Sequence, residues 1–570
     1  MKKITTRFPY KVQHVANAIA LTFALGNAPA LWADQSVSYT YDDKGNVLTE
    51  DGPRVDAQDI TTHTYNPDGT RATTTNALGH VTRYNAYDGA GRLLSVTDPN
   101  GVTTEFTYHV RGWVETVTVK HPSNSSLNAT THYEYDAVGQ LIKITAPDGV
   151  ITHFDYTDAR QLKAVYNDAG ERIEYELDLA GNRKSQQIKN SAGAITFSLA
   201  RTYDELSRVM DITGNNGQNT HIQYDVNNNP TVQTNAKQHS TEQRYDALDR
   251  VKKVIDPALK ETNYTYDAQG NIKTVTDARG KVTQYDYDAF GNLKTLTSPD
   301  TGVTQYTYDE AGNLKTRTDA DGRYAEYLYD ALNRVTQINY PSSPQENVTF
   351  EYDSLAQDTY DGTDWVQNRG VGRLTGRTDA AGTRTYGYDY QGRLVYQGTY
   401  MEDPGQAYSS DLTILYQYDL AGKLTKITYP SNRVVNYSYN SQGRVNLITT
   451  QTNVNAAPVT LFSQAEYLPF GPLNRFSFGN GIQAIYEYDT DYRLGSIKTQ
   501  GPFAILDQVF GYDLADNLNT WKNNLNTPQN QTFEYDPLNR LKTAQSNYGS
   551  VLFNYDEVGN RLQKTLTQNG

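Results

Sequence analysis

A tyrosine followed by an aspartate recurs at a constant interval of 21 residues through the middle of this chain. The run consists of Tyr203, Tyr224, Tyr245, Tyr266, Tyr287, Tyr308 and Tyr329. A fixed period in the twenties indicates a repeat array, in which one supersecondary unit is copied and stacked. Because such units bury surface only against their neighbours, 570 residues need not divide into several globular domains. The repeat constrains the architecture more than the function.

Each repeat unit has the residues of a β-hairpin turn. The chain can be traced as 23 units with reference positions 41, 65, 87, 108, 135, 156, 177, 203, 224, 245, 266, 287, 308, 329, 352, 388, 418, 439, 467, 488, 512, 535 and 555. Every reference residue is Tyr except Leu177, and the next residue is Asp in 18 units. The fourth residue after the reference is Gly in 14 units and Asn or Asp in five more, types that tolerate positive φ. This pattern is typical of a type I turn closed by a G1 bulge, with the Asp side chain accepting from the backbone two residues on.

A second aromatic position predicts a lattice across the sheet. Two residues before the reference, 17 units carry Tyr or Phe, and this spacing places both rings on one face of a strand. We expect Tyr287 opposite Leu293 and Tyr285 opposite Thr295, each cross-strand pair contributing about 0.2–1 kcal/mol. The predicted fold is all-β, a long antiparallel ribbon of hairpins. The structural repeat positions expected to hold it are Tyr266, Asp267, Gly270, Tyr285, Tyr287, Asp288, Gly291, Leu293, Tyr308, Asp309, Gly312, Tyr329 and Asp330.

The first 33 residues differ from the repeat region. A basic start is followed by an apolar stretch and then by small residues, which is typical of a secretory signal peptide cleaved after Ala33 or after Ala30. A single membrane anchor is the alternative, but Asn17, Asn27 and Pro29 interrupt a run that is already short for a span. We therefore expect export, with a periplasmic, secreted or cell-surface product and no integral membrane segment after cleavage.

Charge and cysteine content narrow the function classes. The formal net charge is −14, and removal of the four positive charges among residues 1–33 takes it to −18. An acidic chain without Lys/Arg clusters is a poor candidate for binding nucleic acid. Because the chain has no cysteine, an exported product must be held by sheet pairing and packing instead of disulfides.

The region after the signal is expected to be one repeat domain. It covers residues 34–565, and residues 566–570 form a short tail. The repeat is least regular near 355–416 and 445–465, where turn-rich segments such as 360–365 and 401–405 indicate insertions that cap, plug or decorate the sheet.

The repeat resembles a known family. The segment from Tyr266 to Asp277 looks like the YD repeat of the RHS-repeat family, which includes bacterial polymorphic toxins, insecticidal toxin-complex shells and the animal teneurins. The match covers essentially all of residues 37–565, and three segments look like family landmarks: 370–374, 427–433 and 468–481.

The resemblance implies a ribbon that spirals into a hollow β-shell or part-shell, which in toxin members holds a C-terminal effector. Family members usually continue into an associated core, whose Asp-Pro-x-Gly motif and acidic residues release the effector. Asp98-Pro-Asn-Gly101 matches this motif in letters but lies in the phase of an ordinary turn, so we interpret it as a turn. We expect this chain to lack the core, a protease and an effector.

Catalytic and metal-binding patterns are not expected to carry function here. The repeated Asp-x-x-Gly-Asn lacks the spacing of a calcium loop, so turn formation is preferred to bound calcium. All nine His precede residue 240 without a zinc-ligand pattern, and Gly-x-Ser-x-Gly is absent. Carboxylate pairs are not ruled out, but the regularity of the Asp residues favours structure. We expect no enzyme, no cofactor and no metal.

Two function classes remain. The first is an exported structural shell in an RHS-type toxin or effector encapsulation or delivery system, with a toxin cargo or a separately encoded associated core as partner. The second is a recognition module in which exposed tyrosines stack on glycans or contact a cell-surface receptor.

A length estimate predicts how far the ribbon closes. Twenty-three hairpins give 46 strands, or roughly 220 Å at about 4.8 Å per strand, so a ring of about 25 Å radius would take little more than one revolution. The last strand, near Leu552 to Tyr555, would have nothing after it to cover its edge. We therefore expect a part-shell that a partner closes, or one that self-associates through this edge.

Overall fold

The computed structural model describes residues 36–568 with short gaps at 356–357, 361–364, 402–409 and 503. The predicted signal peptide and parts of both turn-rich insertions lie outside the described residues. Within them the fold is all-β, as predicted: 46 strands form one antiparallel sheet, and two short strands form a separate pair. The 46 strands match the count expected from 23 hairpins.

The sheet follows the chain from one hairpin to the next. Its first half contains β1 (Ser38–Tyr41), β2 (Val47–Asp51), β3 (Ile60–Tyr65), β4 (Arg71–Thr75), β5 (Val81–Tyr87), β6 (Leu93–Thr97), β7 (Thr103–Tyr108), β8 (Val114–Val119), β9 (Ala129–Tyr135), β10 (Leu141–Thr145), β11 (Ile151–Tyr156), β12 (Leu162–Asn167), β13 (Arg172–Leu177), β14 (Arg183–Lys189), β15 (Ile195–Tyr203), β16 (Val209–Thr213), β17 (Asn219–Tyr224), β18 (Pro230–Asn235), β19 (Ser240–Tyr245), β20 (Val251–Ile255), β21 (Glu261–Tyr266), β22 (Ile272–Thr276), β23 (Val282–Tyr287), β24 (Leu293–Ser298), β25 (Gly302–Tyr308) and β26 (Leu314–Thr318).

The second half continues in the same way. It contains β27 (Tyr324–Tyr329), β28 (Val335–Asn339), β29 (Val348–Tyr352), β32 (Leu374–Asp379), β33 (Gly382–Tyr388), β34 (Leu394–Met401), β35 (Ser410–Tyr418), β36 (Leu424–Thr428), β37 (Val434–Tyr439), β38 (Val445–Gln451), β39 (Val459–Tyr467), β40 (Leu473–Phe478), β41 (Gln483–Tyr488), β42 (Leu494–Gln500), β43 (Asp507–Tyr512), β44 (Leu518–Asn523), β45 (Gln531–Tyr535), β46 (Leu541–Ser546), β47 (Gly549–Tyr555) and β48 (Arg561–Gln568). The separate pair is β30 (Asp358–Tyr360) and β31 (Trp365–Gln367), and three 3₁₀ turns are η1 (Ser125–Leu127), η2 (Pro344–Glu346) and η3 (Thr527–Gln529).

The irregular regions are mostly repeat structure with longer connections. In the first, β30 and β31 are an added pair between β29 and β32, which themselves pair directly. In the second, β38 and β39 are ordinary neighbouring strands joined by residues 452–458. The last strand runs to Gln568, which lies inside the stretch assigned from sequence to a tail.

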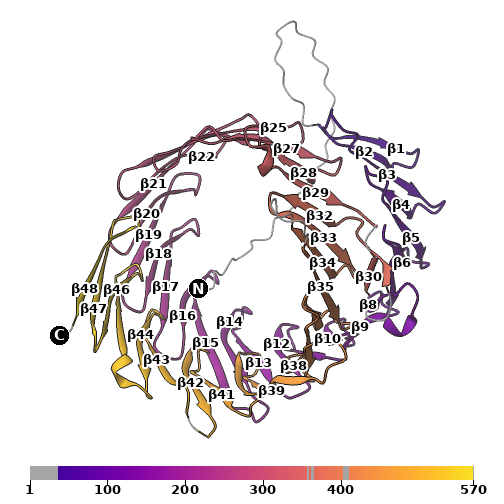
Figure 1. Ribbon diagram of the computed structural model, residues 1–570. Coiled ribbons are helices and arrows are strands. Elements are labelled where there is room, and N and C mark those ends of the chain that lie inside the picture. The colour runs from indigo at the N-terminus through magenta and orange to yellow at the C-terminus, as the bar shows by residue number, and fades with distance from the viewer. Residues whose placement is uncertain (1–35, 356–357, 361–364, 402–409, 503, 569–570) are drawn as a thin grey trace, which may run out of the picture.

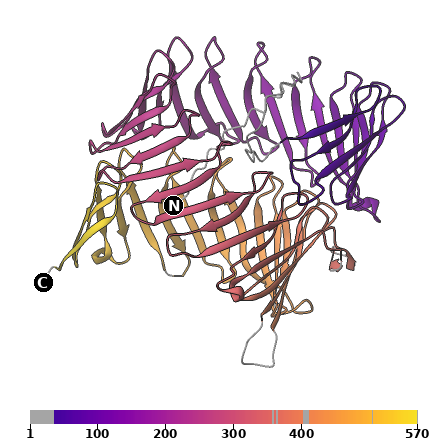
Figure 2. The same ribbon diagram turned by 90° about the horizontal axis from the view of Figure 1, so that it is seen from above.

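The ribbon winds as a spiral around an open centre, with its strands inclined to the spiral axis (Figures 1 and 2). We call β1–β26 the first revolution and β27–β48 the second. Hydrogen bonds between the revolutions join residues 263 to 298 positions apart. Since the sheet runs from residue 38 to residue 568, the chain makes nearly two revolutions.

The expectation of little more than one revolution is therefore wrong. It took the strands as parallel to the ring axis, whereas inclined strands each span more of the circumference than their perpendicular spacing of about 4.8 Å. The expected edge near Leu552 to Tyr555 is also wrong, because β48 pairs with β47 along that whole strand.

The sheet is a single layer, so few side chains are fully buried. Val434 and Ala164 have no exposed surface, and Val395 and Ala484 are nearly buried, but most strand residues are half-exposed. A layer this thin has no conventional core, and its stability must come from contacts between neighbouring hairpins and between revolutions.

Candidate functional site: the turn rims and the seam between revolutions

The turn inside each hairpin, here called the YD turn, is built around its aspartate. The Asp288 carboxylate accepts from the backbone N–H of Phe290 at 2.9 Å and of Asn292 at 2.9 Å, and from the Asn292 amide at 3.0 Å. Gly291 follows with a φ of 86°. Burial acts to raise the pKa of Asp288, but the hydrogen bonds from Asn292 and the turn backbone lower it overall. The expected turn chemistry is confirmed.

The predicted structural positions fall where the repeat placed them. Gly270, Gly291 and Gly312 have φ values of 93°, 86° and 80°. The reference residues end strands, their aspartates begin YD turns, and Leu293 begins a strand. These strand residues are Tyr266 in β21, Tyr285 and Tyr287 in β23, Leu293 in β24, Tyr308 in β25 and Tyr329 in β27, and the turn aspartates are Asp267, Asp288, Asp309 and Asp330.

One of the two expected cross-strand pairs is wrong. Tyr287 lies opposite Leu293 as predicted, but Tyr285 lies opposite Leu296, and Asp286 takes the place facing Thr295. The bulge leaves Lys294 without a partner in the register, which shifts the pairing by one residue. As a result Leu296, a second apolar side chain after Leu293, faces Tyr285.

The reference tyrosines have a role that the sequence analysis missed. Their hydroxyls donate to the backbone carbonyl at the start of the return strand in the preceding hairpin, as Tyr308 does to Leu293 at 2.9 Å and Tyr266 to Val251 at 2.6 Å. The same bond occurs in 19 units at 2.6–3.0 Å. A signal was present, because Phe is common two residues earlier but never occupies the reference position.

Arginines add a second link between neighbouring hairpins. Arg250 binds Asp246 in its own YD turn and lies 4.3 Å from the centre of the Tyr266 ring in the next unit. The Arg250 side chain, together with turn N–H groups, lowers the pKa of Asp246 from 3.8 to about 2. Arg208, Arg334 and Arg540 make the equivalent contacts with Tyr224, Tyr352 and Tyr555.

The two revolutions meet along a seam with a fixed arrangement. Its upper side is the row of connector turns of the first revolution. A connector turn is a turn that joins one hairpin to the next. The lower side of the seam is the row of YD turns of the second revolution. We call these rows the connector rim and the YD rim; Figure 2 shows the first revolution stacked on the second. The seam therefore leaves the YD rim of the first revolution and the connector rim of the second free.

Ion pairs join the two sides of the seam. Arg444 binds both carboxylate oxygens of Glu171, at 3.0 and 2.8 Å. Lys237 binds Asp513 at 2.9 Å, and Lys423 binds Asp148. Burial acts to raise the pKa of Asp148, but the Lys423 ammonium and turn N–H groups lower it overall. These carboxylates are mostly shielded from solvent, so removing the cation that pairs with any of them would leave an uncompensated charge at the seam.

Uncharged groups supply the rest of the seam. The Asn100 amide donates to the Val371 carbonyl at 3.0 Å and accepts from its N–H at 2.9 Å. The Tyr390 hydroxyl donates to the Leu127 carbonyl in η1 at 2.6 Å, and its ring meets His121 edge-on. No periodic pattern in the sequence predicts which residues pair across the seam, because each pair joins different positions of the repeat.

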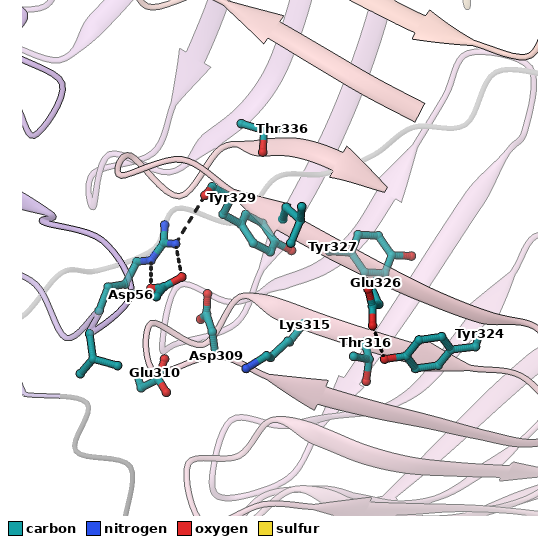
Figure 3. A pocket seen from close by; sticks show the side chains of 13 residues that line it. Asp56, Asp309, Glu310, Lys315, Thr316, Tyr324, Glu326, Tyr327, Tyr329 and Thr336 are labelled. Carbon is teal, nitrogen blue, oxygen red and sulfur yellow. Dashed lines mark hydrogen bonds and ion pairs between the residues drawn. The ribbon is translucent and has the colours of Figure 1, made fainter. Parts of the chain in front are cut away.

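A pocket of about 670 Å³ lies where the seam begins (Figure 3). Arg54 and Asp56 come from the connector after β2 and are ion-paired at 2.8 Å, and Arg54 also donates to the Asp330 carbonyl. The opposite wall comes from β25–β28 and their turns; it carries Asp309, Glu310, Lys315, Tyr324, Glu326, Tyr327 and Tyr329. Tyr324 donates to Glu326 at 2.8 Å. The pocket thus combines aromatic rings with carboxylates.

Metal and membrane sites were also sought. Across the described residues, no cluster of three or more His, Asp or Glu is placed to hold a metal ion. In the same part of the chain, no helix is long and apolar enough to cross a membrane.

Family models match the repeat region. A teneurin YD-shell model matches residues 170–357, and an RHS-repeat model matches residues 65–102, 87–125, 135–172, 370–398 and 418–456. No curated protein sequence matches the chain significantly.

Solved structures share the fold. The crystal structure of TcdB2-TccC3 aligns with a TM-score of 0.73 at 15% identity, covering 93% of this chain and 34% of that chain. The Photorhabdus luminescens Tc holotoxin pore, carrying a mutation in TccC3, aligns with a TM-score of 0.55 at 14% identity, covering 95% and 36%. The chain thus spans about a third of the length of these structures, and identities this low show the fold alone. Family models, repeat geometry and spiral together show that the chain is a structural YD-repeat shell and belongs to the RHS/YD-repeat family.

Proposed function

We propose that this chain is an exported shell that encloses a polypeptide, such as an RHS-type toxin or effector, and performs no catalysis itself. The observation that carries the proposal is the continuous wall formed by the sheet. Nearly two revolutions of one sheet surround an open centre, and the seam between them is closed by ion pairs and amide hydrogen bonds. The solved neighbours named as Tc toxin assemblies agree with such a role.

The histidine–carboxylate pairs support a non-catalytic role. His221 lies 2.8 Å from Asp211, but the Thr202 hydroxyl donates to the other oxygen of Asp211 instead of facing the imidazole. A general base must reach the proton of its nucleophile directly or through one water. Here the Thr202 hydroxyl bonds the carboxylate instead of the imidazole, so His221 is not placed to act as a base toward it. His153 pairs with Asp168 at 2.7 Å and stacks on Tyr166, which is a packing arrangement.

Protease protection tests the shell role. The chain is co-expressed with the product of the following reading frame, purified, and treated with a broad-specificity protease. We expect mass spectrometry to recover a second polypeptide that survives with the intact shell and is digested once Lys423→Ala and Arg444→Ala open the seam. Recovery of no protected polypeptide, or equal protection by both shells, contradicts the proposal.

The export part of the proposal has a separate test. Residues 34–565 would then be the mature shell domain, after removal of residues 1–33. N-terminal sequencing of exported protein should begin at Asp34 or Leu31. A cytoplasmic product that begins at Met1 contradicts export.

Glycan recognition is the second candidate function, and the seam pocket favours it. Tyr324 and Tyr327 lie beside Glu326, and Asp309 and Asp56 lie at the other side of the pocket, a combination of rings and carboxylates suited to sugar rings and their hydroxyls. A glycan array should then show binding that Tyr327→Ala weakens and that Tyr285→Ala, outside the pocket, does not. Absence of binding to the array eliminates this candidate.

A further inference from the structure

The free YD rim of the first revolution carries a row of exposed apolar side chains at its turn tips. Val110, Leu179 and Val226, each two residues after a reference position, have relative exposures of 93%, 108% and 97%. Leu206 and Leu248, each three residues after, have exposures of 66% and 71%. Single exposed apolar residues are ordinary, but a row on one edge indicates an interaction surface.

The seam shows what a YD rim binds. On the second revolution Tyr390 and Leu420, each two positions after a reference residue, are half-buried, and Leu514 at the same position is 46% exposed. Tyr390 rests on η1 of the first revolution through its hydroxyl and through His121. Leu514, at the same repeat position, points toward Gly217 in another connector turn. The YD turn tips of this protein therefore dock on connector turns.

The free connector rim of the second revolution offers the same kind of surface. Its 3₁₀ turns η2 and η3 repeat the construction of η1, since in all three a C-cap Asn side chain accepts from the backbone seven residues earlier. These bonds are Asn128 with His121 N–H at 2.9 Å, Asn347 with Tyr340 N–H at 2.7 Å, and Asn530 with Asn523 N–H at 2.7 Å. Val454 and Leu525 are exposed apolar residues on this rim.

We propose that the free YD rim of one molecule docks on the free connector rim of a second copy of this chain, continuing the seam between molecules. A second copy of this chain is the partner that fits, because the seam already joins these two types of rim within one chain. Such an interface is heterologous, so copies stack head to tail and each added copy leaves both rims free at the ends. This assembly goes beyond the enclosure of a cargo and does not depend on it.

Solution mass tests the assembly. Sedimentation of the purified chain from about 0.1 to about 100 μM, the range in which weak interfaces dissociate, should show mass rising with concentration in steps of one chain. The triple variant Leu179→Lys, Val226→Lys and Leu248→Lys should stay monomeric. The matched control Val282→Lys, Val303→Lys and Leu328→Lys adds the same charge at exposed strand positions and should associate like the parent.

Engineered cysteines test the orientation, since the chain has none of its own. A Val226→Cys chain mixed with Val454→Cys or Leu525→Cys chains should form mixed disulfide dimers under mild oxidation with at least one of them. A parent that stays monomeric overturns the proposal, as does association that the rim variant leaves unchanged. Disulfides formed only between Val226→Cys chains indicate a two-fold pairing and overturn the head-to-tail arrangement. Rim-dependent binding of a monomer to phosphatidylcholine vesicles would replace the proposal with membrane docking.

Discussion

The YD rims of the first and second revolutions are built from the same hairpins but have different surroundings. Asp246 and Asp489 each bind the arginine four residues on, and the reference tyrosine of each hairpin latches to the one before. On the first revolution the turn tips end in solvent. On the second, Arg444 and Lys423 reach across to Glu171 and Asp148.

The difference separates two tasks within one repeat. The Asp, the positive-φ residue and the reference Tyr form the hairpin and join it to its neighbour on both rims. On the docked rim, turn residues such as Asp513, Tyr390 and Arg444, which lie one, two and five positions after their references, also bind the other revolution. Loss of the reference Tyr hydroxyl should therefore act alike on both rims, and a change that adds or removes a contact across the seam should act only where the rim is docked.

The largest difference is expected for the cation five residues after the reference. Lys423→Ala combined with Arg444→Ala should lower the free energy of unfolding by about 4 kcal/mol, because it leaves two shielded carboxylates without partners. Arg208→Ala combined with Arg250→Ala, at the same repeat positions on the free rim, should cost about 1–2 kcal/mol. Denaturant unfolding compares the two, and equal losses would mean that the seam adds no stability.

Glycine substitution should show a smaller difference in the same direction. Gly291→Val should cost about 1 kcal/mol, because a β-branched residue is forced into a φ of 86°. Gly443→Val carries the same strain at a φ of 72°, and its added carbon also meets Lys423 and lies 3.3 Å from Val150 across the seam, for about 2 kcal/mol in all.

Lys294→Val is the control for both glycine variants and should be nearly silent, since Lys294 is exposed at the bulge. Unfolding midpoints for Gly291→Val and Lys294→Val that both match the parent would contradict the turn assignment.

Loss of the hydrogen bond from the reference tyrosine hydroxyl should lower stability equally on both rims. Tyr308→Phe and Tyr439→Phe each remove a hydroxyl that donates to a carbonyl in the preceding hairpin, at 2.9 and 2.6 Å. Each should cost about 1 kcal/mol, the net value of one part-buried hydrogen bond. Thermal unfolding measures both variants, and a neutral result in both would show that the aromatic ring alone holds the lattice.

The sequence predicts the hairpin well because its determinants are local. Asp288 and Gly291 lie three residues apart, and Tyr287 faces Leu293 across one turn, so periodicity alone places them. The bulge at Lys294 shifted the next pair, since the register depends on which residue is skipped. The seam could not be predicted, because Arg444 and Glu171 are 273 residues apart and their meeting depends on the inclination of the strands.

The smallest expected effect is on acid sensitivity. Asp246 has a folded pKa of about 2 against 3.8 for the free group, so its contribution is present above pH 3.8 and is lost as the pH falls toward 2. Asp246→Asn should therefore be slightly less stable than the parent at neutral pH and should lose less stability between those two values.

Asp148 also has a lowered pKa, through Lys423 acting against burial, so Asp148→Asn should flatten the same acid limb. It should in addition loosen the seam at neutral pH, because Lys423 loses its charged partner. Unfolding midpoints from pH 7 to pH 2, with protease sensitivity at pH 7, separate the two variants. Equal protease sensitivity would show that the docked rim gains nothing from this ion pair, and an unchanged acid limb in Asp246→Asn would contradict the lowered pKa.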